Sequence, residues 1–362
     1  MKVLVAMSGG VDSSVAAYLL TKEGFEVSGI SFELWDRRDV SNFNSCCSLE
    51  TIEIAKDVAG KLCIEHYSVD VRDAFYRHVI EGFCDSYVSG LTPNPCILCN
   101  KYIKFAFLLE KADEIGADII ATGHYARVER PGSFNGIDEG TERFLLKKGI
   151  DPKKDQSYFL YVMTQHELSR VVFPLGGMRK EETRRIAEDI CLTNALRAES
   201  QEICFVGDGK YINFVRNFNP DVFKPGPIVS DNGEVLGTHK GIAFYTVGQR
   251  KRLEIPSLIP FYVVDIDSGK NTIIVGDRKG AMKSRLLVRS LNWISIDGLN
   301  EPVRAGVKIR STMMEEPSLI TPGRDSVIVE FDKPQWAPAP GQSAVFYMDD
   351  IVIGGGIIEK EE

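Results

Sequence analysis

The sequence predicts an α/β domain that is followed by two small β domains. Up to about residue 125, apolar stretches of strand length alternate with stretches whose apolar residues recur at helical spacing. From about Lys224, short alternating runs are separated by turn dipeptides such as Asn232-Gly233 and Ser268-Gly269. Because strands that alternate with helices form parallel sheets covered on both faces, we expect a parallel sheet first and antiparallel β structure after it.

The chain has 362 residues, which is long enough for two or three domains. We expect domains over residues 1–210, 211–284 and 285–362, the last of them a β-barrel. In the first domain, the expected strands cover 3–7, 25–34, 63–69 and 117–121, and the expected helices cover 15–20, 48–62, 73–89, 104–115 and 180–190. A loop is expected over 130–141. In the two β domains, strand-like runs cover 242–247, 261–265, 272–275, 303–309, 326–331, 343–347 and 351–358.

Composition describes an ordinary globular protein, with 44% hydrophobic and 26% charged residues. No apolar run reaches the roughly 18 residues of a membrane helix, and the sequence starts directly with a strand rather than a signal peptide. We therefore expect a cytoplasmic protein without a membrane partner. The net charge of −8 argues against general nucleic-acid binding, and no DNA partner is expected. This net charge is still compatible with a local basic surface that binds RNA. One candidate is the helix that carries Arg179, Lys180, Arg184 and Arg185.

The turn after the first strand predicts a polyphosphate site. Residues 8–14 read Ser-Gly-Gly-Val-Asp-Ser-Ser and open directly into a helix. Gly9 and Gly10 allow the backbone to curl and present N–H groups to an anion, and the serine hydroxyls and the helix dipole favour the same ligand. The alternative is an ordinary strand–turn–helix in which Ser8 or Asp12 is only a cap.

This turn differs from the common P-loop, because no lysine follows Gly10. It resembles the PP-loop of the ATP pyrophosphatase superfamily. Members of that superfamily hold the pyrophosphate half of ATP and transfer the AMP half to an acceptor oxygen. The resemblance implies ATP as a cofactor.

Two of the eight cysteines form a second informative motif. Cys96 and Cys99 follow Pro93 and Pro95 at the spacing of metal ligands. One Cys-x-x-Cys pair is half a zinc site, so a redox dithiol, part of a metal or iron–sulfur site, a single reactive thiol at Cys99 and two inert cysteines all remain open. Cys46 and Cys47 suit one metal centre poorly, and we interpret them, with Cys63, Cys84 and Cys191, as structural.

Seven motifs in sequence order resemble those of the tRNA-specific 2-thiouridylase family (MnmA in bacteria, TrmU in mitochondria). They lie at residues 94–105, 121–126, 154–160, 173–176, 203–205, 246–251 and 340–347. The resemblance covers essentially the whole chain. It implies an N-terminal PP-loop domain of the adenine nucleotide alpha-hydrolase type.

The resemblance also implies a reaction. ATP adenylates the C2 oxygen of the wobble uridine in the glutamate, glutamine and lysine tRNAs. Sulfur then attacks C2, AMP leaves, and 2-thiouridine results. An upstream sulfur donor or relay protein is implied as a further partner, and Mg²⁺ as a second cofactor.

Functional residues follow from the matching positions. ATP would be contacted by Ala6, Met7, Ser8, Gly9, Gly10, Val11, Asp12, Ser13, Phe32 and Gly123, with Asp12 also organising Mg²⁺. Cys204 would carry a persulfide, and Cys99 would be the nucleophile that releases its sulfur. The tRNA would be contacted by Asn94, Pro95, Cys96, His124, Lys154, Asp155, Gln156, Arg310, Ser311 and Gln342. From the residues alone, His124 is equally well a structural histidine, Lys154 and Arg310 are surface charges, and Gln342 belongs to a turn.

Cys96 departs from the family pattern, because many members carry an aspartate there that is thought to act as a general base. Cys96, Cys99 and Cys204 together would give three thiolates and one open position, as in the [4Fe-4S] sites of related tRNA thiolases. The sequence therefore leaves two hypotheses open, a persulfide relay and an iron–sulfur cluster.

Three other functions fit part of the chain. Another PP-loop enzyme that adenylates a small-molecule carbonyl or carboxylate would explain the first 125 residues only. A thiol or metal redox protein would leave the PP-loop unexplained, and a binding module without catalysis fits poorly with the acidic net charge. Release of pyrophosphate from ATP only in the presence of tRNA would separate these functions.

Overall fold

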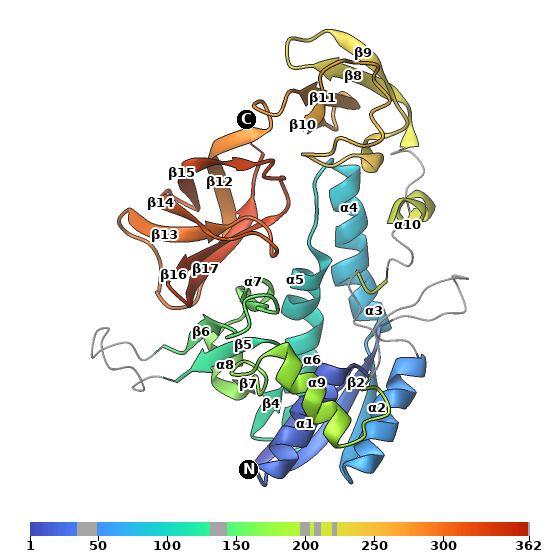
Figure 1. Cartoon of the computed structure of the whole chain (residues 1–362), viewed down its shortest axis with the longest axis vertical. Helices are drawn as coiled ribbons and strands as arrows, with labels where there is room; N and C mark the ends of the chain where they lie inside the picture. The colour runs from blue at the N-terminus through green and yellow to red at the C-terminus, as the bar shows by residue number, and fades with distance from the viewer. Residues whose placement is uncertain (35–48, 131–142, 196–202, 206–210, 219–222, 361–362) are drawn as a thin grey trace.

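In the computed structural model, residues 1–34, 49–130, 143–195, 203–205, 211–218 and 223–360 are described. The N-terminal domain is built on a parallel sheet in the order β3-β2-β1-β4-β7 (Figure 1). Its strands are β1 (Lys2–Ala6), β2 (Glu26–Glu33), β3 (Glu65–Asp70), β4 (Ile119–Ala121) and β7 (Val171–Val172). The predicted parallel sheet is confirmed.

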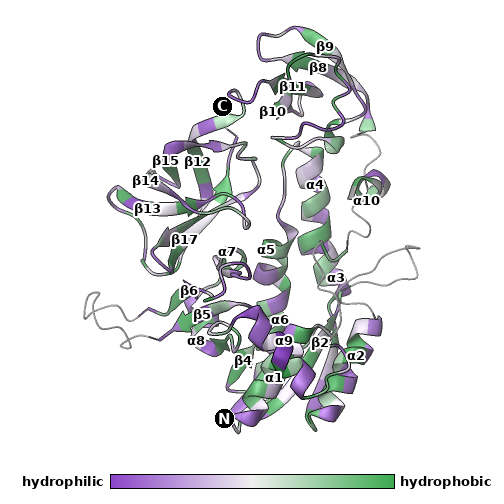
Figure 2. Cartoon of the chain, viewed as in Figure 1, coloured by the Kyte–Doolittle hydropathy of each residue, from purple (hydrophilic) through white to green (hydrophobic). Residues whose placement is uncertain are grey.

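Helices cover both faces of this sheet. The side chains of Val3 and Val5 point to a cluster that includes residues of α1 (Val11–Lys22), α2 (Leu49–Lys61) and α9 (Lys180–Asp189). Leu4 points to the opposite cluster, with residues of α6 (Phe105–Glu114). The alternation follows from the two-residue period of a strand. In Figure 2, β4 is mainly hydrophobic, whereas α9 is mainly hydrophilic.

Two helical rods rise from the sheet toward the central β domain (Figure 1). The first is formed by α3 (Arg72–Phe75), the π-helical turn η2 (Tyr76–Glu81) and α4 (Gly82–Val88). The second is formed by α5 (Pro95–Cys99), the π-helical turn η3 (Asn100–Lys104) and α6. The helix expected to start at residue 104 therefore starts at Pro95, because a proline has no N–H to satisfy in the first helical turn.

The central domain is a four-stranded sheet in the order β10-β11-β8-β9. Its strands are β8 (Gly226–Ser230), β9 (Val235–His239), β10 (Tyr262–Asp267) and β11 (Thr272–Gly276). The expected turns at Asn232-Gly233 and Ser268-Gly269 join antiparallel pairs. The strand expected at 242–247 is wrong. Residues 242–244 form the 3₁₀ turn η6 (Ile242–Phe244), which packs on α4, so tertiary packing overrides the local β propensity.

The C-terminal domain is a closed barrel. Its strands are β12 (Met282–Trp293), β13 (Val303–Lys308), β14 (Glu316–Pro322), β15 (Ser326–Trp336), β16 (Ser343–Met348) and β17 (Ile351–Ile358). They neighbour one another in the order β12-β15-β14-β13-β16-β17, and the ring closes because β12 also pairs with β17. The predicted barrel is confirmed.

The barrel shares its sheet with the N-terminal domain. A hairpin of β5 (Ala126–Glu129) and β6 (Leu145–Lys148) pairs with β17, where Val352 lies opposite Leu146. Arg127 forms an ion pair of 2.6 Å with Asp350 across this junction. The remaining helices are α7 (Ser157–Leu160), α8 (Gln165–Arg170) and α10 (Tyr211–Phe218).

Two sequence-based statements need completing. The loop expected over 130–141 lies, apart from Arg130, outside the described residues, as do Cys46 and Cys47. Within the part of the chain that is described, no helix combines the length and apolarity needed to cross a membrane.

Gly176 gives a test of the packing around the β5 strand. A Cβ at this position would lie 1.8 Å from the carbonyl oxygen of Ala126, so we expect Gly176→Ala to lower the free energy of unfolding by about 1–3 kcal/mol. A Cβ at the neighbouring Gly177 would meet nothing within 4 Å. Gly177→Ala is therefore the matched control, and equal thermal unfolding midpoints for the two variants would contradict the packing argument.

Candidate active site

The turn between β1 and α1 has the geometry of an anion cradle. Gly9 has a φ of +71°, and a Cβ there would lie 2.3 Å from the carbonyl oxygen of Thr51, so only glycine fits. Gly10 is the N-cap of the twelve-residue helix α1 and brings no capping side chain. The Ser13 hydroxyl donates to the Gly10 carbonyl at 3.1 Å and accepts from the Ser8 N–H at 3.2 Å. The turn is thus held rigid at the positive end of α1.

This cradle opens into a cavity of about 230 Å³ at the carboxyl ends of β1, β2 and β4. Strand order reverses between β1 and β4, which is where open parallel sheets bind ligands. Seven of the residues expected to contact ATP line the cavity: Ala6, Met7, Ser8, Asp12, Ser13, Phe32 and Gly123. Gly9, Gly10 and Val11 are not among its lining residues, and shape the turn instead. Gly123 lies so close to α1 that a Cβ would be 2.7 Å from the Ser13 nitrogen.

An ion pair with a buried lysine holds the acidic residue of the turn. The Lys180 ammonium group lies 2.7 and 2.8 Å from the two carboxylate oxygens of Asp12, and the Tyr125 hydroxyl donates to Asp12 Oδ1 at 2.8 Å. Lys180 is only 6% exposed. The expectation that Lys180 belongs to a basic surface is therefore wrong, because its side chain turns inward to compensate the Asp12 carboxylate. Asp12 Oδ2 keeps a second lone pair, which fits a Mg²⁺ ion or its bound water.

Two residues expected at the tRNA line the same cavity. His124 Nδ1 lies 2.6 Å from Thr122 Oγ1, and its Nε2 lies 3.4 Å from Lys104 Nζ. Loss of water around the ring, with the nearby Lys104 charge, holds the pKa of His124 well below its usual value. Gln156 accepts from the backbone N–H of Tyr125 at 3.0 Å. The lining also includes Ile30, Leu34, Ile103, Lys104 and Thr122. The last three lie within the family motifs, but from the sequence none of the five is expected to have a role in the site.

The two cysteines of α5 lie one helical turn apart and differ in exposure. Cys99 lines the cavity, whereas Cys96 is exposed. Cys204 and Cys99 both pack on the core cluster of the N-terminal domain. The position of the Cys204 segment is fixed by Phe205, whose ring meets Phe75 and Phe83 edge to face at centroid distances of 5.7 and 5.2 Å.

The other thiols differ from these. Burial raises the pKa of the Cys84 thiol to about 12, so it stays protonated and unreactive. Among the described residues, no three His, Cys, Asp or Glu side chains are grouped closely enough to hold a metal ion. In this structure Cys96, Cys99 and Cys204 are therefore not grouped as metal ligands.

Three family models match the chain in succession. They describe a tRNA methyl transferase HUP domain (residues 1–208), a tRNA methyl transferase PRC-barrel domain (212–277) and an aminomethyltransferase beta-barrel domain (283–358). A tRNA-specific 2-thiouridylase MnmA 2 of Thermoanaerobacter sp. (strain X514) is 48% identical over 99% of this chain and 98% of its own length. The chain belongs to the tRNA-specific 2-thiouridylase family. The resemblance predicted from the seven motifs is confirmed.

Two further matches are a second relative and a solved structure. The tRNA-specific 2-thiouridylase MnmA of Clostridioides difficile (strain 630) is 45% identical over 99% of this chain and 98% of its own length. Among solved structures, a 4-thiouridine synthetase in an RNA complex with bound ATP is 18% identical, with a TM-score of 0.37 over 61% of this chain and 50% of that one.

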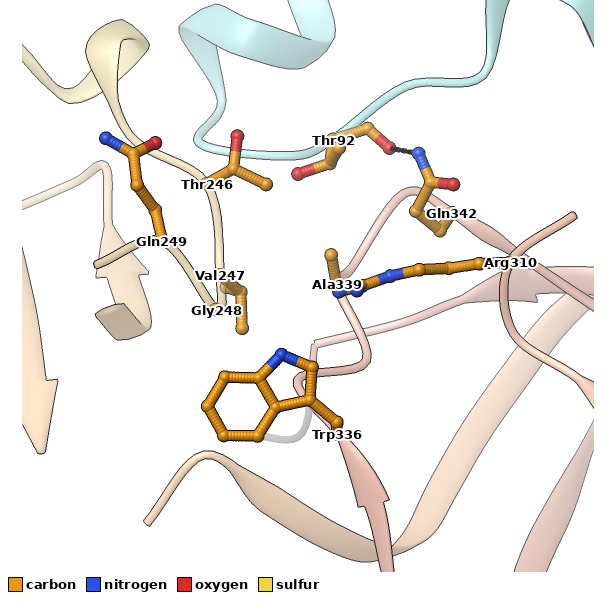
Figure 3. A pocket seen from close by; sticks show the side chains of 9 residues that line it. All are labelled: Thr92, Thr246, Val247, Gly248, Gln249, Arg310, Trp336, Ala339 and Gln342. Atoms are coloured by element: carbon orange, nitrogen blue, oxygen red, sulfur yellow. Dashed lines mark hydrogen bonds between the residues drawn. The ribbon is translucent and has the colours of Figure 1, made fainter. Parts of the chain in front are cut away.

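This member of the thiouridylase family has a second cavity, of about 360 Å³, where the three domains meet. Figure 3 shows Arg310 and Trp336 of the barrel on one side, Gln249 of the central domain on another, and Thr92 from the segment before α5. Arg310 donates to the Ala337 carbonyl at 2.6 Å, and loss of water lowers the pKa of its guanidinium group. An aromatic ring, a cation and polar side chains in one hollow suit an unstacked nucleobase.

Gln342 holds the segment that leads to the cysteines. Its amide donates to the Thr92 carbonyl at 2.9 Å (Figure 3) and to the Pro93 carbonyl at 3.2 Å. The Thr92 N–H donates to the Pro340 carbonyl at 2.8 Å. Gly341 has a φ of +89°, and a Cβ there would lie 3.0 Å from Leu91 Cβ. The barrel therefore fixes the start of α5.

The remaining expected tRNA residues lie in three segments of the chain. Asn94 is the N-cap of α5, ahead of the buried Pro95. Asp155 is nearly buried, accepts from the Gly149 and Ser157 N–H groups, and lies 3.6 Å from Lys308. Lys154 and Ser311 are partly exposed.

The Asp12–Lys180 pair gives a first prediction for this site. Lys180→Met leaves the Asp12 charge uncompensated beside the phosphate cradle, so we expect ATP affinity to fall at least about tenfold and the free energy of unfolding to fall by about 1–3 kcal/mol. Calorimetric titration and thermal unfolding measure the two effects. Arg185→Met, an exposed position on the same helix, is the control. Adding Asp12→Asn to Lys180→Met should restore stability, and ATP affinity unchanged in Lys180→Met would contradict the assignment.

The contacts of Gln342 give a second prediction. Gln342→Ala removes both bonds to the segment before α5, so we expect faster amide hydrogen exchange over residues 92–99 with ATP affinity unchanged. Exchange measured by mass spectrometry provides the test. Gln335→Ala is the matched control, because the Gln335 side chain donates within its own strand, to the Lys333 carbonyl at 2.8 Å. Equal exchange over 92–99 in both variants would show that Gln342 does not hold the segment.

Proposed function

We propose that this protein is an ATP-dependent tRNA 2-thiouridine synthase, a tRNA-uridine 2-sulfurtransferase acting on the wobble uridine of the glutamate, glutamine and lysine tRNAs. We further propose domain boundaries at residues 1–210, 211–284 and 285–362. One observation carries the proposal. Cys99 lines the same cavity as the phosphate cradle. A uridine bound in this cavity would therefore lie beside both the Cys99 thiol and the phosphates of ATP.

In the first step, the C2 oxygen of the uridine would attack the α-phosphorus of ATP, and pyrophosphate would leave. The N–H groups at the start of α1, with the hydroxyls of Ser8 and Ser13, would hold the pyrophosphate. Ile30, Phe32 and Leu34 give the cavity an apolar wall that suits the adenine ring. When bound, Mg²⁺ would neutralise phosphate charge, and Asp12 is the residue placed to hold it.

In the second step, sulfur would replace the activated oxygen. Cys204 would carry a persulfide received from an upstream donor. The Cys99 thiolate would attack the Cys204 sulfur, and the terminal sulfur would leave with its electron pair to attack C2. AMP would then depart with the former C2 oxygen, leaving the C2 thiocarbonyl. The Cys99–Cys204 disulfide formed in this way needs an external thiol reductant before the next turnover.

A second candidate for the sulfur step is a [4Fe-4S] cluster on Cys96, Cys99 and Cys204. Its support is the thiol at position 96, where many family members carry an aspartate. The described positions of these cysteines favour the persulfide relay, since they are not grouped as metal ligands.

The tRNA would lie across the junction of the three domains. The second cavity would accept a nucleobase of the anticodon region on Trp336 and Arg310, and the wobble uridine would enter the first cavity beside Cys99. We keep Asn94, Pro95, Lys154 and Ser311 as tRNA contacts. His124, Asp155, Gln156 and Gln342 are proposed to shape the tRNA site through their contacts within the protein.

Nucleoside mass analysis of tRNA after incubation with ATP and a sulfur source tests the proposed function. We expect 2-thiouridine with the unmodified protein and a loss of at least about 10³-fold with Cys99→Ser or Cys204→Ser, because each removes a nucleophile of the relay. Cys63→Ser, at an exposed thiol, is the control. Pyrophosphate release without tRNA, driven by a small acid or amine, would instead support a small-molecule adenylating enzyme.

Cys96→Ala separates the two sulfur mechanisms. A persulfide relay predicts that this variant keeps most of its activity and that neither protein holds iron after anaerobic reconstitution. A cluster predicts iron and sulfide in the unmodified protein and the loss of both in Cys96→Ala.

A further inference from the structure

Lys104 shares a cavity with Cys99 because of an unusual helical turn. The two residues are five positions apart, which in an α-helix of 3.6 residues per turn would separate their directions by about 140°. Between them the backbone forms the π-helical turn η3, where the Phe105 N–H donates to the Asn100 carbonyl five residues back. This wider turn brings residues five apart onto one side of the rod. Both side chains consequently line the cavity.

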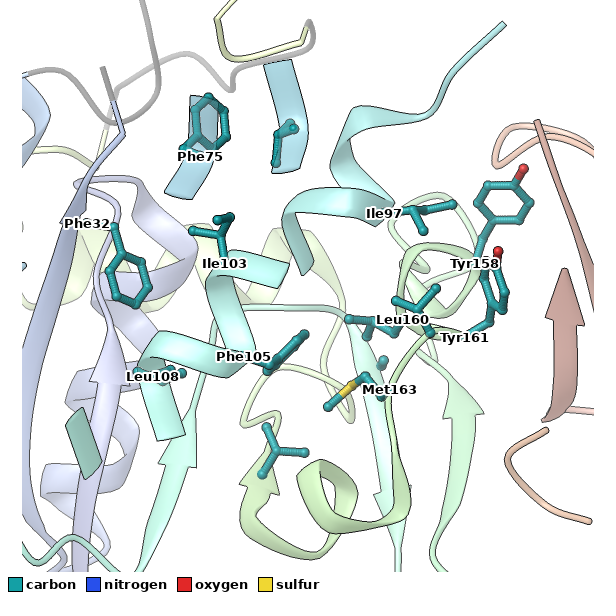
Figure 4. Packing of buried hydrophobic residues seen from close by; sticks show 14 of the residues in the cluster. Phe32, Phe75, Ile97, Ile103, Phe105, Leu108, Tyr158, Leu160, Tyr161 and Met163 are labelled. Atoms are coloured by element: carbon teal, nitrogen blue, oxygen red, sulfur yellow. The ribbon is translucent and has the colours of Figure 1, made fainter. Parts of the chain in front are cut away.

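The backbone of Lys104 is fixed by its neighbours. Ile103 and Phe105 are fully buried, and Figure 4 shows both packed among the hydrophobic side chains of the N-terminal domain. Asn100, at the start of the same turn, donates to the Phe159 carbonyl at 2.9 Å. The position of the ammonium group is therefore set by a rigid support.

A neutral histidine orients the Lys104 side chain. An ammonium group can only donate, so His124 Nε2 accepts from Lys104, and the single ring proton of a neutral imidazole lies on Nδ1 and is donated to Thr122. The His124 ring itself packs against Phe105 and Phe173, at centroid distances of 6.0 and 5.8 Å. This arrangement directs Lys104 without neutralising its charge.

Within the described lining of the cavity, Lys104 is a cation that no carboxylate compensates. Asp12 is the carboxylate that lines the cavity, and Lys180 already compensates it. Among the described residues, no carboxylate lies within ion-pair distance of Lys104. With one excess positive charge among its described lining residues, the cavity is suited to an anion.

We propose that Lys104 binds the α-phosphoryl group of the adenylated uridine and of the AMP that leaves, with His124 and Thr122 as positioning residues. This inference rests on the proposed function. The N-terminus of α1 holds the pyrophosphate end of ATP, whereas Lys104 comes from the wall that carries Cys99. The group between the pyrophosphate and the sulfur donor is the α-phosphoryl group. As the bond from C2 to oxygen breaks, negative charge grows on AMP, and a nearby cation stabilises it.

Equilibrium binding of AMP and of inorganic pyrophosphate to the full chain tests the assignment. We expect Lys104→Met to weaken AMP binding at least about tenfold and to leave pyrophosphate binding within about twofold, because only the α-phosphoryl contact is lost. Lys104→Arg should keep most of the AMP affinity. Lys101→Met is the matched control, since Lys101 belongs to the same π-helical turn but is exposed. Retained pyrophosphate binding also shows that the variant has folded.

A double variant tests the positioning role. His124→Phe should weaken AMP binding less than Lys104→Met, and adding it to Lys104→Met should cause no further loss, because both changes remove the same contact. Unchanged AMP affinity in Lys104→Met, or a loss confined to pyrophosphate, would overturn the inference. A protein that binds AMP through Lys104 but leaves tRNA unthiolated would overturn the proposed function and keep the anion site.

Discussion

The ion pair between Asp12 and Lys180 joins the two ends of the N-terminal domain at the phosphate cradle. Asp12 lies in the first turn of α1, and Lys180 begins α9, 168 residues later. A charge that is taken out of water needs a partner, and removing one member of such a pair is far more costly than the pair itself is stabilising. The pair therefore fixes how α9 closes over α1, and it also removes the charge that would repel a polyphosphate.

The barrel and the N-terminal domain form one structural unit around the chemistry. The β5–β6 hairpin continues the barrel sheet through β17, and the Pro340–Gln342 turn of the barrel bonds the segment before α5. Both contacts use backbone groups, which are geometrically strict and costly to leave unpaired. The barrel is thereby coupled to the helix that carries Cys96 and Cys99.

The electrostatics of the cavity also depend on which charges are compensated within the protein. Lys180 compensates the Asp12 carboxylate, and burial keeps His124 neutral. Lys104 faces the cavity without a carboxylate partner among the described residues. The site is thus organised for a ligand that brings its own negative charge. The π-helical turn η3 makes this possible, because it places Lys104 beside Cys99 rather than on another side of the rod.

The sequence by itself determined the features that depend on residues close together along the chain. The parallel strands, the glycine turn at Gly9 and Gly10, the hairpin at Asn232-Gly233 and the strands of the barrel follow from local periodicity and backbone freedom. One signal was overlooked: Lys180 lies three residues before the buried Thr183, so it falls on the inner face of α9. The tertiary structure alone decided the partner of Lys180, the joining of β6 to β17 and the direction of Lys104. Each depends on groups that the fold brings together or on a π-helical turn that residue spacing does not encode.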